Sequence, residues 1–281
     1  MISKADFTAE GVDGGRGREA PSGRGEERAG GRPERVVGLL PVLDEVATIR
    51  AVVESVLSSG CVERLLVVDD FSTDGTLQEL EAARSRYPQM DVVIRRHERG
   101  LGTALQFGFE EALRRYAFDR LVVLDADMSH DPKVIPRLLS AHADLVIGSR
   151  YAPGGRIENW PASRQVISLL ANSAARWLLG LPVRDVTSGF RIYSRRAVQV
   201  MAEEAACGGY EFQVEVVWLA TRHGFTINEA PIAFVERKAG KSKLRTWGEM
   251  GRFLRFVLEK SILRTLPGKG GDSLAHIDRV A

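Results

Sequence analysis

From residue 35 onward the chain alternates short runs rich in β-branched residues with longer amphipathic stretches, and this alternation limits the possible folds. The short runs are apolar on both faces, as are strands buried in a parallel sheet. The expected strands span residues 36–42, 65–69, 92–95, 121–124 and 145–148. The expected helices span residues 45–57, 76–86, 103–115 and 132–141. Strands separated by helices of this length predict βαβ units, and therefore an α/β fold with a mostly parallel sheet flanked by helices.

Local residue types also predict how some of these helices begin. We expect Asp74 to cap the helix over 76–86, and Asp131-Pro132 to place a proline in the first turn of the helix over 132–141. Gly100-Leu101-Gly102 is similar to the start of a dinucleotide-binding loop, but the third glycine position holds Leu105. A tight turn from strand to helix is the better interpretation.

Acidic residues gather where two of the expected strands end. One strand runs into Asp69-Asp70, and another runs into Asp125-Ala126-Asp127. In open α/β sheets, ligands bind at the carboxyl ends of the strands. Carboxylates held close together repel unless a cation lies between them, and hard oxygen ligands favour Mg²⁺ or Mn²⁺ over zinc. Asp125-Ala126-Asp127 therefore predicts a divalent metal site; the alternative is two solvated acidic residues at the start of a loop.

The second half of the chain holds basic and polar residues that suit an anion. A helix is expected over residues 162–179, and Arg164 and Ser168 lie one turn apart on it. They can bind one anion together. The alternative is that Arg164 is an ordinary surface charge and Ser168 has no binding role. Residues 185–191 are expected to form a loop into a further strand, and residues 209–223 a helix with its lead-in. Residues 235–243 form a basic loop that could clamp a diphosphate or simply be solvated.

Charge and cysteine content exclude several classes of protein. The 281 residues include 39 basic and 37 acidic side chains, so the chain lacks the basic character of a nucleic-acid coat. Residues 1–34 contain Gly-Arg steps, but six basic side chains face seven acidic ones there, which argues against an RNA-binding arm. We expect this segment to be a disordered tail. Cys61 and Cys207 alone make no disulfide scaffold or cysteine-rich zinc site, and both are expected to be reduced core thiols.

The C-terminal part of the chain has the pattern of a membrane-surface helix. Between residues 236 and 269, ten basic side chains outnumber three acidic ones. The apolar side chains of one broad helix face are Trp247, Met250, Phe253, Leu254, Val257, Leu258, Ile262 and Leu266, with Arg252, Arg255, Lys260 and Arg264 among them. A basic amphipathic helix predicts contact with a membrane surface; the alternative is a helix packed on the domain.

These patterns predict three parts in the chain. They are a disordered Gly/Arg/Glu-rich tail over residues 1–34, an α/β domain over 35–245, and a basic amphipathic helix with a C-terminal tail over 246–281. The sequence contains no run of about 18 apolar residues, the length that a membrane span needs. Its N-terminus also lacks the apolar stretch that is typical of a secretory signal. Any membrane contact is therefore expected to be peripheral.

A set of short motifs occurs in one order from Pro41 to Lys243. The motifs are Pro41-Val42-Leu43-Asp44-Glu45, Asp69-Asp70 with Ser72 and Asp74-Gly75, Asp125-Ala126-Asp127, Ser149-Arg150-Tyr151, Gly189-Phe190-Arg191 and Ser242-Lys243. In this combination the chain resembles the dolichol-phosphate (polyprenyl-phosphate) mannosyltransferases, which are inverting family 2 glycosyltransferases. The resemblance implies the GT-A fold, a Rossmann-like, mostly parallel sheet flanked by helices, here with a C-terminal amphipathic helical segment.

The resemblance also implies roles for individual residues. The nucleoside pocket would be lined by Pro41, Leu43, Glu45, Val68 and Asp70. Asp125 and Ala126 would lie against the ribose and diphosphate, and the metal ligands would be Asp127, Ser129 and Asp125. Arg237 and Lys243 would close over the donor diphosphate, while Arg150, Arg164 and Ser168 would hold the acceptor phosphate. The residues expected to act on the reacting groups are Asp127, Arg150, Arg237 and Lys243.

The reaction implied by the resemblance is transfer of mannose from GDP-mannose to a polyprenyl (dolichyl) phosphate with inversion, with Mg²⁺ or Mn²⁺ as cofactor and no nucleic acid as partner. A phosphate monoester has a second pKa of about 6, so this nucleophile is already anionic and needs no general base. The enzyme is expected at the cytoplasmic face of a membrane, bound peripherally. The alternatives are a UDP-glucose:polyprenyl-phosphate glucosyltransferase or another lipid-phosphate transferase, a nucleotide- or lipid-binding module without turnover, and an RNA-binding protein acting through its Gly-Arg tail.

Overall fold

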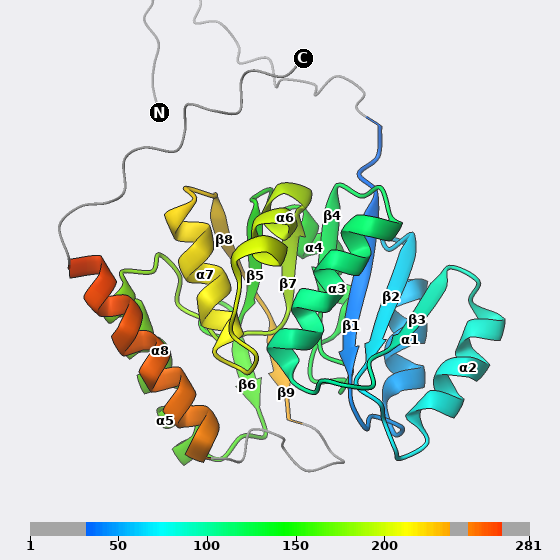
Figure 1. Ribbon diagram of the computed structural model, residues 1–281, viewed down its shortest axis with the longest axis horizontal. Coiled ribbons are helices and arrows are strands. Elements are labelled where there is room, and N and C mark those ends of the chain that lie inside the picture. The colour runs from blue at the N-terminus through cyan, green and yellow to red at the C-terminus, as the bar shows by residue number, and fades with distance from the viewer. Residues whose placement is uncertain (1–31, 237–246, 266–281) are drawn as a thin grey trace, which may run out of the picture. The chain divides into compact units, whose positions relative to one another are not determined.

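A central sheet of parallel strands with one reversed strand organises the protein, whose computed structural model describes residues 32–236 and 247–265. The strand order is β3-β2-β1-β4-β7-β5-β8 (Figure 1). The strands are β1 (Val36–Val42), β2 (Arg64–Asp69), β3 (Met90–Ile94), β4 (Arg120–Val123), β5 (Leu145–Ser149), β7 (Arg191–Ser194) and β8 (Ile227–Pro231). Only β7 runs antiparallel to its neighbours, β4 and β5, among these strands. The predicted mostly parallel sheet is confirmed.

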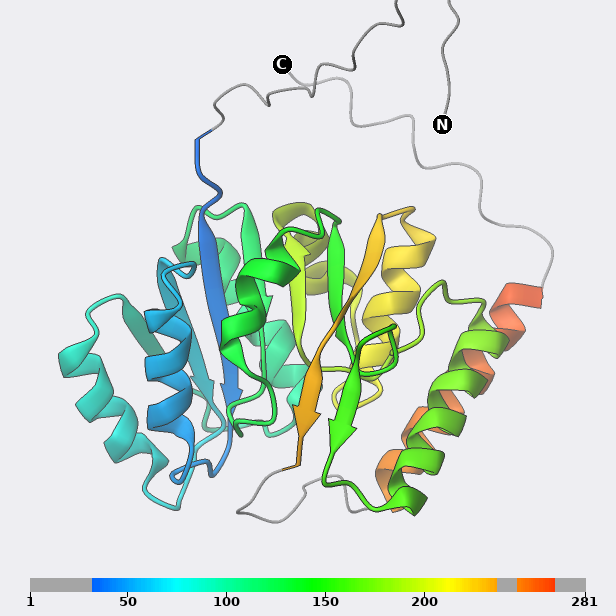
Figure 2. The ribbon, with the colours of Figure 1, turned by 180° about the vertical axis from the view of Figure 1, so that it is seen from behind.

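Helices cover both faces of this sheet (Figures 1 and 2). The helices α1 (Ile49–Ser58), α2 (Thr76–Arg86) and α4 (Ile135–Leu139), with the 3-10 turn η1 (Pro132–Val134), lie on one face; α3 (Leu101–Arg115), α6 (Arg195–Glu204) and α7 (Phe212–Arg222) lie on the other. The alternation of side chains along β1 explains the two layers. Val36, Leu40 and Val42 join the core on the α1 side, while Val37 and Leu39 join the core on the α3 side.

Two long helices and a small second sheet complete the described part. The helices α5 (Ala162–Leu179) and α8 (Trp247–Thr265) lie side by side at one edge of the main sheet (Figures 1 and 2). In α8, Phe253, Phe256 and Val257 are buried in the same core as α7. The strands β6 (Arg156–Glu158) and β9 (Ala233–Val235) pair in parallel. Among the described helices, none is both long enough and apolar enough to cross a bilayer.

The structure confirms most of the expected elements and corrects several local details. The helix expected over 45–57 begins at Ile49, and the one expected over 132–141 is the turn η1 followed by the short helix α4. The helices over 76–86 and 162–179 have the predicted bounds. The residue that caps α2 is Gly75, with φ of 104°, rather than Asp74, whose carboxylate accepts a hydrogen bond from the Thr76 main chain at 3.0 Å. Both cysteines are free thiols as expected, but they are half-buried rather than core residues. Residues 1–31 of the expected tail and residues beyond 265 lie outside the described part.

Candidate active site

The carboxyl ends of β1, β2 and β4 share one edge of the sheet, and the chain turns sharply after each of them. Asp44, Phe71 and Met128 follow these strands with φ of 50°, 59° and 61°. Residues other than glycine rarely adopt this left-handed conformation, and such strain is typical of functional sites. The Thr48 hydroxyl donates a hydrogen bond of 2.8 Å to the Ala126 carbonyl, which ties the turn after β1 to the turn after β4. The residues predicted from these two turns are therefore brought together.

Hydrogen bonds between the turns after β1 and β2 fix their shape. The Ser72 main chain and hydroxyl both donate to the Asp69 carboxylate, at 2.8 and 2.6 Å. The Asp44 main chain donates to the Ser72 hydroxyl at 2.8 Å, and the Thr73 main chain donates to the Asp44 carboxylate at 2.8 Å. The carboxylates of Asp44 and Asp69 therefore accept hydrogen bonds that stabilise the two turns.

The residues expected at the nucleoside divide into half-buried and buried groups. Pro41, Leu43 and Glu45 are half-buried at the end of β1, where a ligand can reach them. The Glu45 main chain is held by the Thr76 hydroxyl, to which it donates at 2.8 Å. Val68 is fully buried in the hydrophobic core, so it supports this edge of the sheet from within.

Asp70 forms a buried ion pair that the sequence patterns did not indicate. Its carboxylate oxygen Oδ1 lies 2.9 Å from Nε of Arg95, and both side chains are buried. The other oxygen accepts a hydrogen bond of 3.0 Å from the Gly100 main chain at the start of α3. Burial raises the pKa of Asp70, although the Gly100 N–H and the Arg95 charge act in the opposite direction. The end of β2 and the start of α3 are thus connected through this carboxylate.

The turn after β4 presents the acidic residues of the predicted metal site. One oxygen of Asp127 accepts hydrogen bonds from the Ser129 main chain, at 2.9 Å, and from the Ser129 hydroxyl. Oδ2 of Asp125 lies 3.3 Å from Nε2 of His130. Gly189, from the loop before β7, faces Asp125: a Cβ atom there would lie 3.0 Å from both oxygens of the carboxylate. The lack of a side chain at Gly189 makes room for Asp125.

The oxygen atoms of this turn suit a hard divalent cation. Within the ranges that the structure describes, no three or more His, Cys, Asp or Glu side chains are grouped to hold a metal ion. Mg²⁺ and Mn²⁺ do not need such a cage when they are bound through one or two carboxylates, waters and the phosphates of a substrate. Asp125 and Asp127, with the Ser129 hydroxyl, supply a donor set of this kind.

Arg150, directly after β5, is a buried cation locked to a buried carboxylate. Its Nε and one terminal nitrogen donate to the two oxygens of Asp185 at 2.8 and 2.7 Å, and its main chain donates to the same carboxylate at 2.9 Å. The same terminal nitrogen donates to the Thr187 hydroxyl at 2.7 Å. Burial lowers the pKa of Arg150 and the Asp185 charge raises it, with a net upward shift. Arg150 in turn holds the pKa of Asp185 down against the effect of burial, so the pair is ionised.

Ser168 belongs to a polar network on α5. The Tyr151 hydroxyl donates to the Ser168 hydroxyl at 2.8 Å. Asn172, one turn further along, donates to the Ser168 carbonyl at 2.8 Å and to the Thr187 hydroxyl at 3.1 Å. Because Thr187 also accepts from Arg150, the network connects Ser168 to the predicted acceptor arginine.

Arg164, in the first turn of α5, contacts an aromatic ring and a carboxylate. Its guanidinium carbon lies 4.1 Å from the centre of the Trp160 ring, and Nη1 forms an ion pair with Oε1 of Glu236. The side chains of this pair are 31% and 30% exposed. The Arg150 guanidinium lies 5.6 Å from the same Trp160 ring, so one ring contacts both of the arginines predicted for the acceptor phosphate.

A row of rings connects the acidic turn after β4 to these arginines. The His130 ring lies 5.3 Å from the Phe234 ring, which lies 5.3 Å from the Trp160 ring. Asp125 contacts one end of the row through His130, and Arg164 contacts the other end through Trp160. The two halves of the predicted site therefore belong to one continuous set of contacts. Sequence reasoning missed all three rings, because residues this far apart in the chain have no spacing signal.

Arg237 and Lys243, expected on the donor diphosphate, lie outside the described residues. The first of the two described ranges ends at Glu236, immediately after β9. The Val235 main chain donates to the Ser129 carbonyl at 3.2 Å, and the Glu236 main chain donates to a carbonyl of β6 at 3.1 Å. The residue before Arg237 is therefore fixed close to the turn after β4.

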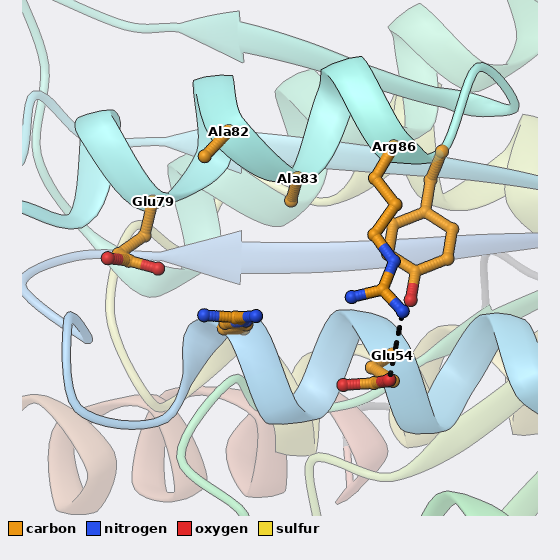
Figure 3. A pocket seen from close by; sticks show the side chains of 7 residues that line it. Glu54, Glu79, Ala82, Ala83 and Arg86 are labelled. Atoms are coloured by element: carbon orange, nitrogen blue, oxygen red, sulfur yellow. Dashed lines mark ion pairs between the residues drawn. The ribbon is translucent and has the colours of Figure 1, made fainter.

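A small groove between α1 and α2 contains none of the residues predicted for the active site (Figure 3). It is lined by Arg50, Glu54, Glu79, Ala82, Ala83, Arg86 and Tyr87. Arg86 and Glu54 approach to 3.9 Å across it. The residues predicted to carry chemistry lie instead at the carboxyl edge of the sheet.

Comparison with known proteins agrees with this architecture. Residues 39–201 match the sequence model of Glycosyl transferase family 2. The chain is 40% identical over 217 residues to the polyprenol monophosphomannose synthase of Mycolicibacterium smegmatis, covering 75% of this chain and 81% of that protein. It is also 40% identical over 215 residues to the undecaprenyl-phosphate mannosyltransferase of Micrococcus luteus, covering 75% of this chain and 87% of that protein.

Among solved structures, the glucosyl-3-phosphoglycerate synthase of Mycobacterium tuberculosis in complex with Mn²⁺, uridine diphosphate and glucosyl-3-phosphoglycerate has a TM-score of 0.59 and 22% identity. The match covers 84% of this chain and 82% of that one. This similarity supports the GT-A fold expected from the sequence. The sequence match, the relatives and the arrangement of the strand ends agree: the chain belongs to glycosyl transferase family 2.

Proposed function

We propose that this enzyme transfers mannose from GDP-mannose to the phosphate of a polyprenyl phosphate, with inversion, and releases GDP. The names of the two relatives that share 40% of their aligned residues with the chain support mannose as the sugar and a polyprenyl phosphate as the acceptor. The structural observation that carries the proposal is the row of His130, Phe234 and Trp160. It links a carboxylate turn suited to a metal diphosphate with two arginines suited to a phosphate.

The donor half of the proposed site consists of the strand ends. Pro41, Leu43, Glu45 and Asp70 would contact the nucleoside, with Ala126 against the ribose and diphosphate. Asp127, Asp125 and the Ser129 hydroxyl would hold Mg²⁺ or Mn²⁺. The presence of Mn²⁺ with uridine diphosphate in a protein of similar fold supports the use of a divalent cation. When bound, such a cation stabilises the negative charge that develops on a departing diphosphate. Arg237 and Lys243 are proposed to contact the same diphosphate.

In the acceptor half, the chain's own residues bring a second anion close to the first. Arg164 and the Ser168 hydroxyl would bind the acceptor phosphate, with Arg150 as a fixed cation beside them. A planar guanidinium suits a phosphate because it can donate two parallel hydrogen bonds. The phosphate monoester is already ionised near neutral pH, so these residues need to bind and aim it rather than remove a proton.

The membrane surface is proposed to lie against α5 and α8. Exposed apolar side chains line both helices: Val166, Ile167, Leu169, Leu170, Trp177 and Leu178 on α5, and Met250, Leu254, Leu258 and Ile262 on α8. Trp177 is 82% exposed. Clusters of exposed apolar side chains typically mark an interaction surface. Arg252 and Arg255 lie on the same helix, where Arg255 is paired with Glu259 at 2.7 Å and Arg252 lies 3.5 Å from Glu211. Because Arg164 and Ser168 also lie on α5, a lipid held at this face would reach the phosphate site. The protein would bind peripherally, at the cytoplasmic face.

A donor screen tests the proposal directly. Radiolabelled GDP-mannose and UDP-glucose are each offered with undecaprenyl phosphate, with Mn²⁺ or Mg²⁺ present. The expected result is label in the lipid fraction from GDP-mannose only, as a β-linked mannosyl phosphate. Label from UDP-glucose alone would replace the proposal by a glucosyltransferase. Nucleotide binding without any transfer would favour a binding module.

A further inference from the structure

The two arginines proposed for the acceptor phosphate each contact a carboxylate already. Arg150 is paired with Asp185, and Arg164 is paired with Glu236. The charges of these four side chains cancel. An incoming phosphate, with a charge of about −1.5 to −2 near neutral pH, therefore meets no net attraction from them unless one carboxylate withdraws.

The two carboxylates differ in how firmly they are held. Asp185 is completely buried and accepts hydrogen bonds from both the main chain and the side chain of Arg150. Its withdrawal would leave a buried guanidinium unpaired, which is strongly unfavourable. Glu236 is 30% exposed at the end of β9, and one of its oxygens meets one nitrogen of Arg164. Ion pairs with this degree of exposure contribute little to stability, so Glu236 can give way where Asp185 cannot.

Arg164 is placed so that its anion can be exchanged. The stacking of its guanidinium on the Trp160 ring, at 4.1 Å, does not involve Glu236 and can hold the cation while the anion changes. Ser168, one turn further along the same helix, supplies a hydroxyl for the incoming group. We infer that Glu236 occupies the place on Arg164 that the acceptor phosphate takes, and that competition between the two anions sets the affinity for the acceptor. This inference rests on the proposed function and names the residue that tunes its acceptor site.

The variant Glu236→Gln tests the competition, because it keeps the size of the side chain and removes its charge. We expect the KM for undecaprenyl phosphate to fall about three- to tenfold, while the KM for the sugar donor stays the same. Glu158→Gln is the matched control: it removes a carboxylate from the neighbouring strand β6, where Glu158 pairs with Arg156 at 2.6 Å. The control should leave both constants unchanged. An unchanged or raised acceptor KM in the folded Glu236→Gln variant would overturn the inference, because Glu236 would then aim Arg164 rather than compete for it.

A binding measurement separates this inference from the proposed function. Farnesyl phosphate, inorganic phosphate and farnesol are titrated calorimetrically into the wild type and the Glu236→Gln variant, without donor. We expect the variant to bind farnesyl phosphate and inorganic phosphate about three- to tenfold more tightly, with no change for farnesol. If this gain occurs in a protein that transfers no sugar, the proposed function fails and the competition stands. If sugar is transferred but neither phosphate binds more tightly, the competition fails and the function stands.

Discussion

The carboxylate of Asp185 holds the guanidinium of Arg150 through two hydrogen bonds of 2.8 and 2.7 Å, across 35 residues of sequence. Both side chains are buried, and the loop that bears Asp185 also carries Gly189, which faces Asp125. One loop therefore determines the position of the Arg150 guanidinium and leaves room for the Asp125 carboxylate.

Replacing Asp185 with Asn should destabilise the protein by about 3–5 kcal/mol, because the Arg150 charge would remain buried without a counter-ion. The free energy of unfolding in urea measures this loss. Glu54→Gln is the control, since Glu54 pairs with Arg86 at 3.9 Å and these side chains are 51% and 61% exposed. The control should cost at most about 1 kcal/mol. Equal losses in the two variants would show that burial does not determine the strength of the Arg150–Asp185 pair.

Gly189→Ala should lower the rate of sugar transfer by about tenfold or more, because the new methyl group would displace the Asp125 carboxylate. The free energy of unfolding should fall by about 1–3 kcal/mol. Gly251→Ala in α8 is the control, because a Cβ atom there would meet nothing within 4 Å. It should leave turnover unchanged and stabilise the helix by up to about 1 kcal/mol. Normal turnover in folded Gly189→Ala would mean that the position of Asp125 is not critical.

Asp127→Ala should reduce metal-dependent transfer by at least about 100-fold, because it removes a carboxylate proposed to hold the cation. A second readout is thermal unfolding with nucleotide and Mn²⁺: the wild type should be stabilised and the variant should not. Asp131→Ala is a suitable control, since Asp131 is exposed and caps η1 through the Lys133 main chain at 3.0 Å. If Asp127→Ala kept its stabilisation by Mn²⁺, the metal would have to bind elsewhere.

Trp177→Ser and Leu258→Ser should each weaken flotation with liposomes that contain anionic lipid, because they remove apolar side chains from the exposed faces of α5 and α8. Point variants are preferable to deletion of α8, since deletion would also remove the buried side chains of Phe253, Phe256 and Val257. Ile94→Ser is the control: it removes an exposed apolar side chain from β3, at the opposite edge of the sheet. Flotation that is equally weak in all three variants, or unchanged in all of them, would contradict the proposed membrane face.

Arg95→Met should destabilise the protein more at pH 8 than at pH 4.5. Burial already raises the pKa of Asp70 with Arg95 present, and removal of this cation should raise it further. In the window between the unfolded pKa of about 4 and the folded pKa, the native state binds more protons than the unfolded state, so stability falls as pH rises. Urea unfolding across this range measures the slope. The double variant Arg95→Met/Asp70→Asn should lose this slope, and a slope that persisted would assign it to another group.

Local patterns predicted the first five strands and the bounds of α2 and α5, because the periodicity of apolar residues is a property of neighbouring positions. The reversed direction of β7 followed from no local pattern, since a four-residue strand has the same composition whichever way it runs. The apolar face expected for α8 is divided in the structure. Phe253 and Val257 are buried in the core, whereas Leu254 and Leu258 are exposed. The helix therefore packs on the domain through part of this face, and contact of the exposed part with a membrane stays a prediction.

Within the candidate site, the sequence indicated residues whose type and position after a strand suggested chemistry, such as Asp125 and Asp127. The sequence did not indicate the charged residues that pair with other members of the predicted site, namely with Asp70, Arg150 and Arg164. Arg95, Asp185 and Glu236 are common surface residue types in sequence, and only the tertiary fold shows that each pairs with a predicted site residue. Trp160 and Phe234 lie 74 residues apart in the sequence and meet beside the pairing of β6 with β9.

The reversal of β7 has a consequence for how this scaffold can diversify. Since β7 is antiparallel to β4 and β5, the segment that enters β7 arrives at the same edge that its neighbours leave. Under the proposed function, recognition of the acceptor would depend largely on this entry segment, residues 185–190, and on α5, whereas the segments that leave β1, β2 and β4 would contact the nucleotide. Exchange of these two modules between enzymes with different acceptors offers a way to re-engineer the product while the sugar nucleotide is kept.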